Sequence, residues 1–387
     1  MTLFIQHAHI LTPDEVLEDG AVVVENGRLT AVAPSHTLTP PPNAQIIDAT
    51  GQYLIPGLID LQLNGGFGHD FTQDPGTIWK VARQLPQHGV TSFLPTIITA
   101  PLSVSQRGLD VLAQGSPAGF VGAAPLGLHI EGPFLNPAKK GAHNRAHIQP
   151  PSLTATRHWS ATNGVALVTL APEMPGALPL VEALAGRGVV VSAGHSMATL
   201  AEARAGFEAG IRYGTHLFNA MPPLHHREPG LVGALLTDER MTIGLIPDGI
   251  HVHPALVKMV WEGVARERLN FVTDAMGALG MPPGRYLLGD HEVYVSETTA
   301  QLADGTLAGS IISLDTALRQ AIAYTESSLT AVLPTFTSVP ARLLGLDHQL
   351  GHIRPGYLAN MVLLSSTYRV NSTIINGIII NNIDENC

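Results

Sequence analysis

The sequence has little charge and almost no cysteine. Of its 387 residues, 13% are charged, which is about half the share found in an average soluble domain, and the formal net charge is −10. No cluster of lysine and arginine could follow a phosphate backbone, so we expect no nucleic-acid partner. The single cysteine, Cys387, excludes an internal disulfide framework and a metal site made of thiolates.

Segments that would place the chain in a membrane or direct it out of the cell are also missing. The opening sequence MTLFIQHAHILTP lacks the basic region and the following apolar region of a signal peptide. No apolar run approaches the roughly 18 residues that are needed to cross a bilayer. We therefore expect a cytoplasmic protein with no membrane partner.

Apolar side chains, by contrast, are plentiful, and their pattern changes along the chain. Hydrophobic residues make up 45% of the sequence, enough to form an ordered core. From residue 54 onwards, continuous apolar runs alternate with alanine-rich helical stretches, as expected for parallel strands that are buried on both faces. Eight such alternations predict a (β/α)8 barrel of the TIM type rather than an open, doubly wound sheet. The expected strands lie near residues 58–64, 90–96, 126–131, 165–171, 189–194, 211–217, 242–247 and 270–274.

Both ends of the chain show a shorter period. Alternating segments on either side of Asn26-Gly27 are typical of a β-hairpin, and β patterning returns from residue 348. We predict an α/β protein of two parts. Residues 1–53 and 348–387 would form a small β-sandwich domain, and residues 54–347 would form the barrel.

Three chemically capable side chains stand at the ends of predicted strands. Glu131 ends the third strand, His195 the fifth and His216 the sixth. Active sites of such barrels are built at the carboxyl ends of the strands, so these side chains should converge. One carboxylate and two imidazoles, with a position left for water, are the ligands of a hydrolytic Zn²⁺ site. The alternative for each residue taken alone is that it caps its strand or satisfies a backbone group.

A fourth ionisable side chain, Asp274, follows the eighth predicted strand. A carboxylate beside an apolar strand is costly unless it is paired or functional. Close to a metal ion, it could take a proton from water and later deliver this proton to a leaving group. The alternative role is to cap the helix that follows.

Three further residues could contact a substrate or support the site. His143 lies in the loop after the third strand, where it could bind a carbonyl or hydroxyl group. Arg227 lies in a loop framed by proline and glycine and could bind an anionic group, although an ion pair with Glu228 or another acid is the more common fate of an exposed arginine. We interpret His129, two residues before Glu131, as a packing or ligand-supporting residue.

Taken in order, a series of short motifs resembles the N-acetylglucosamine-6-phosphate deacetylases, a family within the amidohydrolase superfamily. The resemblance covers essentially the whole chain. It implies hydrolysis of the acetamide of N-acetylglucosamine 6-phosphate to glucosamine 6-phosphate and acetate, in amino-sugar catabolism or recycling. The motifs are Pro56–Gly65 (PGLIDLQLNG), His129–Phe134 (HIEGPF), Lys140–His143 (KGAH), Gly194–Ser196 (GHS), Thr215–Met221 (THLFNAM), Arg227–Gly230 (REPG), Asp248–His251 (DGIH), Thr273–Ala275 (TDA) and Gly305–Ser310 (GTLAGS).

The resemblance also implies roles for individual residues. It places one divalent metal ion on Glu131, His195 and His216, with zinc expected and iron, cobalt or manganese as alternatives, and it makes Asp274 the residue that shuttles the proton. The binding partner would be an amino-sugar phosphate, and the chain would form a homo-oligomer, either a dimer or a tetramer. The implied substrate contacts are Ala142, His143, Asn219, Ala220, Arg227, Asp248, His251, Leu307, Ala308 and Gly309.

The first predicted strand departs from a common pattern of the superfamily. Many relatives carry His-x-His there and bind two metal ions, whereas this chain has Gln62-x-Asn64. Neutral amides are poor ligands for zinc beside imidazole and carboxylate, so we interpret this pair as a vestigial second-metal position and expect one metal ion per chain. Gly66 stands where similar chains carry cysteine, so no thiol is expected near the site.

Two alternative functions stay open. One is the same reaction on N-acetylgalactosamine 6-phosphate, because a pocket that distinguishes one hydroxyl configuration cannot be recognised in a sequence. The other is a non-catalytic binding protein with the amidohydrolase fold. The presence of Glu131, His195, His216 and Asp274 together argues against this second alternative.

Overall fold

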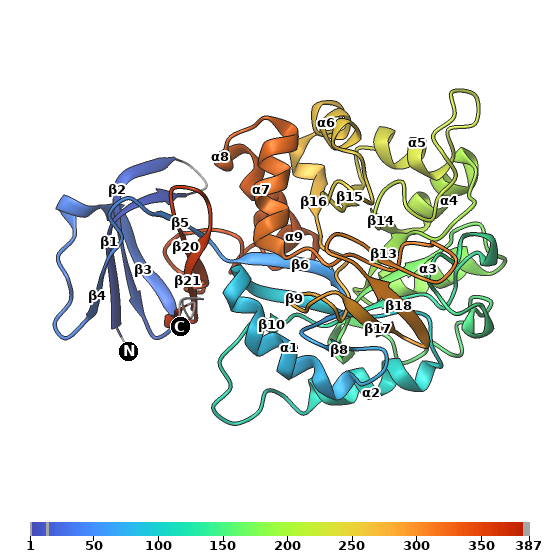
Figure 1. Cartoon of the computed structure of the whole chain (residues 1–387), viewed down its shortest axis with the longest axis horizontal. Helices are drawn as coiled ribbons and strands as arrows, with labels where there is room; N and C mark the ends of the chain where they lie inside the picture. The colour runs from blue at the N-terminus through green and yellow to red at the C-terminus, as the bar shows by residue number, and fades with distance from the viewer. Residues whose placement is uncertain (1, 13–14, 382–387) are drawn as a thin grey trace.

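The computed structural model describes residues 2–12 and 15–381, and it contains the predicted barrel (Figure 1). Its parallel strands follow the order β6-β9-β11-β12-β13-β14-β15-β16, and the short strand β10 (Ala124–Pro125) also pairs with β9. Backbone hydrogen bonds join the first strand to the segment after the last one: the amide nitrogen of Asp274 lies 2.9 Å from the carbonyl oxygen of Gln62. The eight strands are β6 (Leu58–Leu63), β9 (Val90–Ile97), β11 (Leu128–Glu131), β12 (Val165–Leu170), β13 (Val190–Ala193), β14 (Ile211–Gly214), β15 (Thr242–Leu245) and β16 (Leu269–Phe271).

An α-helix follows seven of these strands, but none follows β11. The segment between β11 and β12 contains only three short 3₁₀ turns among its residues, so the expected strict alternation is wrong at this position. Prolines at 133, 137, 150 and 151 divide this segment into shorter stretches, because proline disfavours the interior of a helix. The helices around the barrel are α1 (Ile78–Gln84), α2 (Leu102–Ala113), α3 (Ala177–Gly186), α4 (Leu200–Ala209), α5 (Gly230–Thr237), α6 (Pro254–Gly263) and α7 (Leu314–Thr325).

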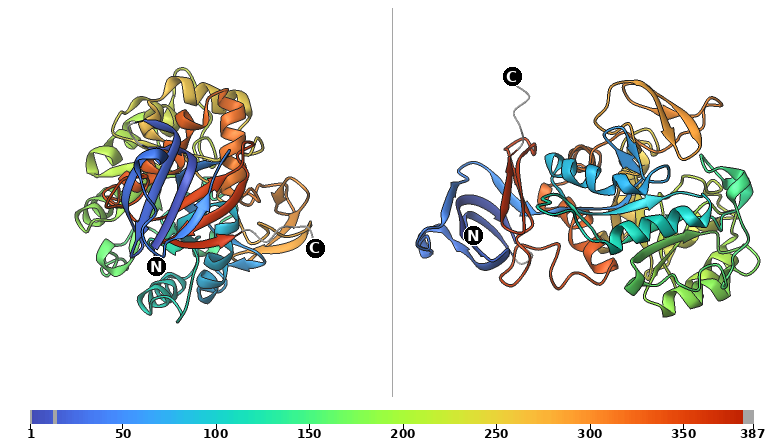
Figure 2. Two further views of the ribbon diagram at one scale, coloured as in Figure 1. Left: turned by 90° about the vertical axis from the view of Figure 1, so that its left-hand side faces the viewer. Right: turned by 90° about the horizontal axis from the view of Figure 1, so that it is seen from below.

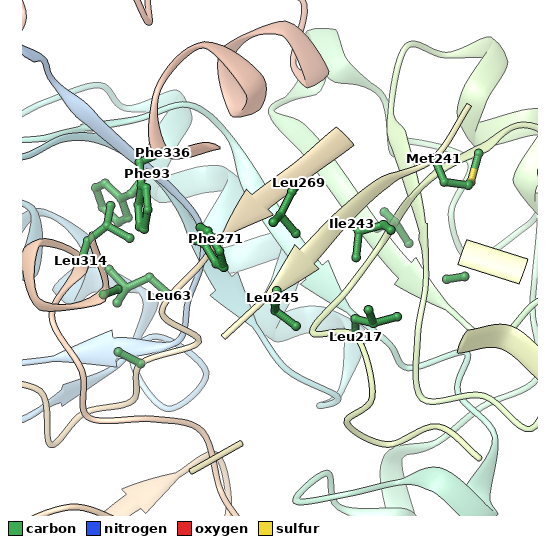
Figure 3. Packing of buried hydrophobic residues seen from close by; sticks show 14 of the residues in the cluster. Leu63, Phe93, Leu217, Met241, Ile243, Leu245, Leu269, Phe271, Leu314 and Phe336 are labelled. Carbon is green, nitrogen blue, oxygen red and sulfur yellow. The ribbon is translucent and has the colours of Figure 1, made fainter. Parts of the chain in front are cut away.

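The two-residue period of the strands separates the core from the site. On β11, Leu128 and Ile130 are buried in the main hydrophobic cluster of the barrel. His129 and Glu131 therefore take the opposite face of the strand. Figure 3 shows part of that cluster, in which Phe271 of β16 stacks on Phe336 with ring centroids 5.3 Å apart. Packing of the apolar residues thus directs Glu131 away from the cluster.

Strands from both ends of the chain form one sheet beside the barrel (Figure 2). The hairpin turn lies at Asn26 and Gly27, both with positive φ, as expected for a two-residue hairpin. The sheet confirms that the two termini build a common β structure, although the pattern that starts at residue 348 becomes a strand only at Met361. The strands are β1 (Thr2–Leu11), β2 (Val16–Glu25), β3 (Arg28–Pro34), β4 (Gln45–Asp48), β5 (Tyr53–Pro56), β20 (Met361–Leu364), β21 (Val370–Ile375) and β22 (Ile378–Asn381).

The sheet does not by itself fix the limits of the two predicted domains. The division into residues 1–53 with 348–387 and residues 54–347 stays a prediction. Residues 382–387, which include Cys387 and the end of the proposed β domain, lie outside the described residues.

A small antiparallel sheet between β16 and α7 was not expected from the sequence. It consists of β17 (Gly284–Leu288), β18 (His291–Val295) and β19 (Ala300–Gln301). The remaining short elements are β7 (Gly65–Gly66), β8 (His69–Asp70), α8 (Leu329–Val332) and α9 (Ser338–Leu343). Within residues 2–12 and 15–381, every helix is too short or too polar to cross a lipid bilayer.

Candidate active site

Glu131, His195 and His216 converge at the carboxyl end of the barrel, as their positions in the sequence predict. Nε2 of His195 lies 3.2 Å from Oε1 of Glu131, Nε2 of His216 lies 3.0 Å from the same oxygen, and the two nitrogens lie 3.1 Å apart. All three side chains are buried. Tetrahedral ligands at about 2.0–2.1 Å from a zinc ion stand roughly 3.3 Å from one another. The triangle of donor atoms therefore has the size that a metal ion requires.

The chemistry of these three donors also fits a metal ion. Nδ1 of His195 lies 2.9 Å from the carbonyl oxygen of Lys139, to which it can donate its proton. Such a bond leaves Nε2 as a lone-pair donor and holds the ring in place, as in many metal sites of proteins. Although burial opposes ionisation, the interactions with the two imidazoles hold the pKa of Glu131 well below its usual value. An ionised carboxylate and two imidazole nitrogens thus face one another.

The backbone at the site is held in an uncommon conformation. His195, His216 and Asp274 all have positive φ, at 47°, 29° and 50°. Non-glycine residues in this region cost about 1–3 kcal/mol each and often occur where function requires them. At Gly194, a Cβ atom would stand 2.2 Å from Cγ2 of Thr215, so only glycine fits between the strands that carry the two histidines. The chain therefore bends at the strand ends and directs these side chains inward.

Asp274 lies in the same pocket as the three donors. Burial and the nearby charge of Glu131 raise its pKa to about 6. A carboxyl group with a pKa near neutrality can both accept and return a proton at physiological pH. Its oxygen Oδ1 accepts a hydrogen bond of 2.7 Å from Nδ2 of Asn64. Asp274 therefore has the position and the proton affinity expected of an acid–base group.

His143 is neutral and has a defined tautomer. Burial holds its pKa well below the usual value. The backbone amide of Thr99 donates to Nδ1 of His143 at 3.2 Å, so the proton of the ring is on Nε2. Nε2 lies 3.8 Å from Oε2 of Glu131, on the side of the metal ligands. His143 thus presents an N–H donor at the site.

Most of the expected substrate contacts line this pocket, but three do not. Ala308 is fully buried, in a cluster with Met276 and Val293. Asp248 instead binds His251, with 2.6 Å between its Oδ2 and Nδ1 of the imidazole. Arg227 is exposed, and its Nη1 lies 3.1 Å from Nε2 of His226. The expected residues that do line the pocket are Ala142, His143, Asn219, Ala220, His251, Leu307 and Gly309.

Some pocket residues and contacts were missed in the sequence. Leu288 reaches the pocket from the unexpected strand β17, and Ile98 follows β9; neither carries a signal that distinguishes it from core residues. Thr306 also lines the pocket, and the GTLAGS motif could have indicated it. His129 bridges Thr96 and Thr169 within the barrel, at 3.2 and 2.8 Å, in agreement with a packing role.

Comparison with known proteins identifies the family of this chain. The sequence matches the amidohydrolase family over residues 53–380. It is 41% identical over 353 residues to the N-acetylglucosamine-6-phosphate deacetylase of Bos taurus, covering 87% of this chain and 86% of that protein. It is 38% identical over 380 residues to the N-acetylgalactosamine-6-phosphate deacetylase of Escherichia coli O157:H7, covering 97% and 99% of the two chains.

A solved structure resembles the whole chain. A mutant N-acetyl-D-glucosamine-6-phosphate deacetylase from Mycobacterium smegmatis, in complex with N-acetyl-D-glucosamine-6-phosphate, gives a TM-score of 0.89 at 32% identity. The match covers 98% of this chain and 100% of that one. These findings confirm the resemblance carried by the motifs, and the chain belongs to the amidohydrolase family.

Proposed function

We propose that this protein is a metal-dependent deacetylase that hydrolyses the acetamide of N-acetylglucosamine 6-phosphate to glucosamine 6-phosphate and acetate. The observation that carries the proposal is the convergence of Glu131, His195, His216 and Asp274 in one pocket. The names of the relatives support the choice of substrate. Release of acetate from this sugar phosphate by the purified protein tests the proposal, and absence of release from fully metallated protein would refute it.

Each of these pocket residues has a separate role in the proposed reaction. A divalent ion on Glu131, His195 and His216 would polarise the acetyl carbonyl and lower the pKa of water. Asp274, when ionised, takes the proton from the attacking water and then gives it to the departing nitrogen, which leaves as an amine. The N–H of His143 donates to the carbonyl oxygen, where negative charge develops during the attack. Neutral His143 can serve this role because it donates a hydrogen bond through Nε2–H and keeps that proton throughout the reaction.

We expect one metal ion per chain. At the end of β6, amides replace the imidazoles that would hold a second ion, and both amides are already hydrogen-bonded to carboxylates. Elemental analysis of protein purified without added metal should give a stoichiometry near one, with zinc as the expected element. A reproducible value near two in active enzyme would contradict the single-ion site.

The phosphate end of the substrate is assigned to Arg227 and His251. His251 lines the pocket, and its ring is oriented by Asp248. Arg227 is exposed and does not line the pocket. We propose it as a phosphate ligand because of the family resemblance and because a guanidinium group binds phosphate through two parallel hydrogen bonds. Binding energy from the remote phosphate would also orient the acetamide.

Replacing Arg227 by alanine should therefore affect phosphorylated substrate alone. Loss of a hydrogen bond to a charged group costs about 1.5–3 kcal/mol, so we expect kcat/KM on the 6-phosphate to fall roughly 10- to 150-fold. The rate on unphosphorylated N-acetylglucosamine should change little. Arg204→Ala, at an exposed position of α4, is the matched control and should leave both values unchanged. Equal losses on the two sugars would mean that Arg227 supports the fold instead.

One relative supports a second candidate substrate. The N-acetylgalactosamine-6-phosphate deacetylase of Escherichia coli matches nearly the full length of this chain. The same metal ligands and Asp274 would perform that reaction, so the two functions differ only in the contacts to one sugar hydroxyl. A homo-oligomeric state and a cytoplasmic location also remain predictions, to be checked by sedimentation and by fractionation of cells.

A further inference from the structure

Gln62 and Asn64, the two amides at the end of β6, each hold a carboxylate of the site. Nε2 of Gln62 donates to Oε1 of Glu131 at 3.1 Å. Its own oxygen Oε1 accepts a hydrogen bond of 2.7 Å from the hydroxyl of Thr215. Gln62 and Thr215 are both fully buried. Because the hydroxyl of Thr215 holds the oxygen of the amide, the nitrogen is turned towards Glu131.

The side-chain amide of Asn64 donates to Asp274, the proposed proton shuttle, as that of Gln62 does to Glu131. Its Nδ2 donates to Oδ1 of Asp274 at 2.7 Å, and its side chain is 1% exposed. Backbone hydrogen bonds fix the distance between the two segments, since the amide nitrogen of Asn64 lies 2.8 Å from the carbonyl oxygen of Ala275. With Oδ1 held by the amide, Oδ2 is the oxygen left to exchange a proton.

An amide suits both positions for the same physical reason. It donates a hydrogen bond to a buried carboxylate without bringing a charge, and it cannot itself take the proton that Asp274 must carry. Loss of a side chain that orients a metal ligand typically lowers metal affinity by a factor of 10–100. An imidazole at either position would instead offer a lone pair for a second ion.

We propose that Gln62 and Asn64 are positioning residues: Gln62 orients Glu131 for the metal ion, and Asn64 orients Asp274 for proton transfer. This assignment replaces the interpretation of the pair as a vestigial metal position, and it rests on the proposed function for the role of Asp274. It predicts different consequences for the two amides. Loss of Gln62 weakens metal binding, whereas loss of Asn64 slows turnover.

For Gln62, the readout is metal affinity, measured as zinc retention in competition with a chelator and without substrate. Gln62→Leu should weaken affinity about 10- to 100-fold. Gln62→Asn, which keeps the amide but cannot reach both Thr215 and Glu131, should act in the same direction and serves if the leucine variant does not fold. Thr215→Val should weaken affinity less. In the Gln62→Leu background, Thr215→Val should change affinity less than about twofold, because Thr215 acts through Gln62.

For Asn64, the readout is the division between kcat and KM. A hydrogen bond to a charged group is worth about 1.5–3 kcal/mol, so Asn64→Leu should lower kcat roughly 10- to 150-fold. KM and zinc affinity should each stay within about threefold of the parent. Asn64→Ala is the second variant. Turnover of the parent protein is measured on the same substrate. An inactive parent would refute the proposed function, whereas an active parent with slowed Asn64 variants supports the positioning role.

Asn270 provides the matched control. It is a buried amide of β16, bonded to the hydroxyl of Tyr213 and the carbonyl oxygen of Thr335 rather than to a carboxylate. Asn270→Leu should cost stability but leave zinc affinity and kcat of the folded protein unchanged. The proposal is overturned for Gln62 if its variants bind zinc as tightly as the parent. It is overturned for Asn64 if its variants raise KM at unchanged kcat or lose zinc.

Discussion

Replacing Asp274 by asparagine should lower kcat about 10⁴-fold while the protein stays folded and keeps its metal ion. General acid–base groups typically contribute a factor of about 10²–10⁴, and Asp274 would serve both the attack of water and the departure of the amine. Asparagine has nearly the same shape but cannot carry the proton. Because the variant keeps the shape of the side chain, its unfolding temperature should stay close to that of the parent.

Steady-state kinetics, elemental analysis and thermal unfolding of Asp274→Asn check these three expectations separately. Unchanged metal content with lost turnover would identify a chemical role. A variant within tenfold of the parent at neutral pH would show that another group moves the proton.

Removal of any one ligand should abolish metal binding and activity together. We expect Glu131→Ala, His195→Ala and His216→Ala each to lose the stoichiometric ion and to release no detectable acetate, because two remaining donors of a buried site cannot hold the ion firmly. His129→Gln is the matched control, since His129 is a buried histidine on the same strand as Glu131 whose side chain is hydrogen-bonded to Thr96 and Thr169. The control should retain about one ion per chain. A ligand variant that keeps both its ion and its activity would remove that residue from the site.

The positions of the barrel strands could be predicted because they depend on local sequence. Each strand is a continuous apolar run, and the side chain that follows it must lie at one end of the barrel. This reasoning alone brings Glu131, His195 and His216 together, and the structure places them 3.0–3.2 Å apart. The segment after β11 departs from the pattern: it contains four prolines, which disfavour one continuous helix across it.

Contacts between distant segments could not be predicted in this way. Gln62 meets Glu131 and Thr215 across separations of 69 and 153 residues, and Asn64 meets Asp274 across 210. No local period records such pairs. The sequence therefore indicated that these amides cannot bind zinc well, but not that each of them holds a carboxylate. The β17 strand, which brings Leu288 to the pocket, was missed because an insertion between β16 and α7 has no place in the regular alternation.

The central claim is that this protein uses a metal ion to deacetylate N-acetylglucosamine 6-phosphate, and the most direct test is the kcat/KM of acetate release on both acetylated amino-sugar 6-phosphates, before and after chelation. The account predicts a preference for the glucosamine compound of at least about tenfold, loss of activity on removal of the metal and recovery on addition of zinc. Activity that survives complete removal of the metal, or a preference for the galactosamine compound, would contradict it.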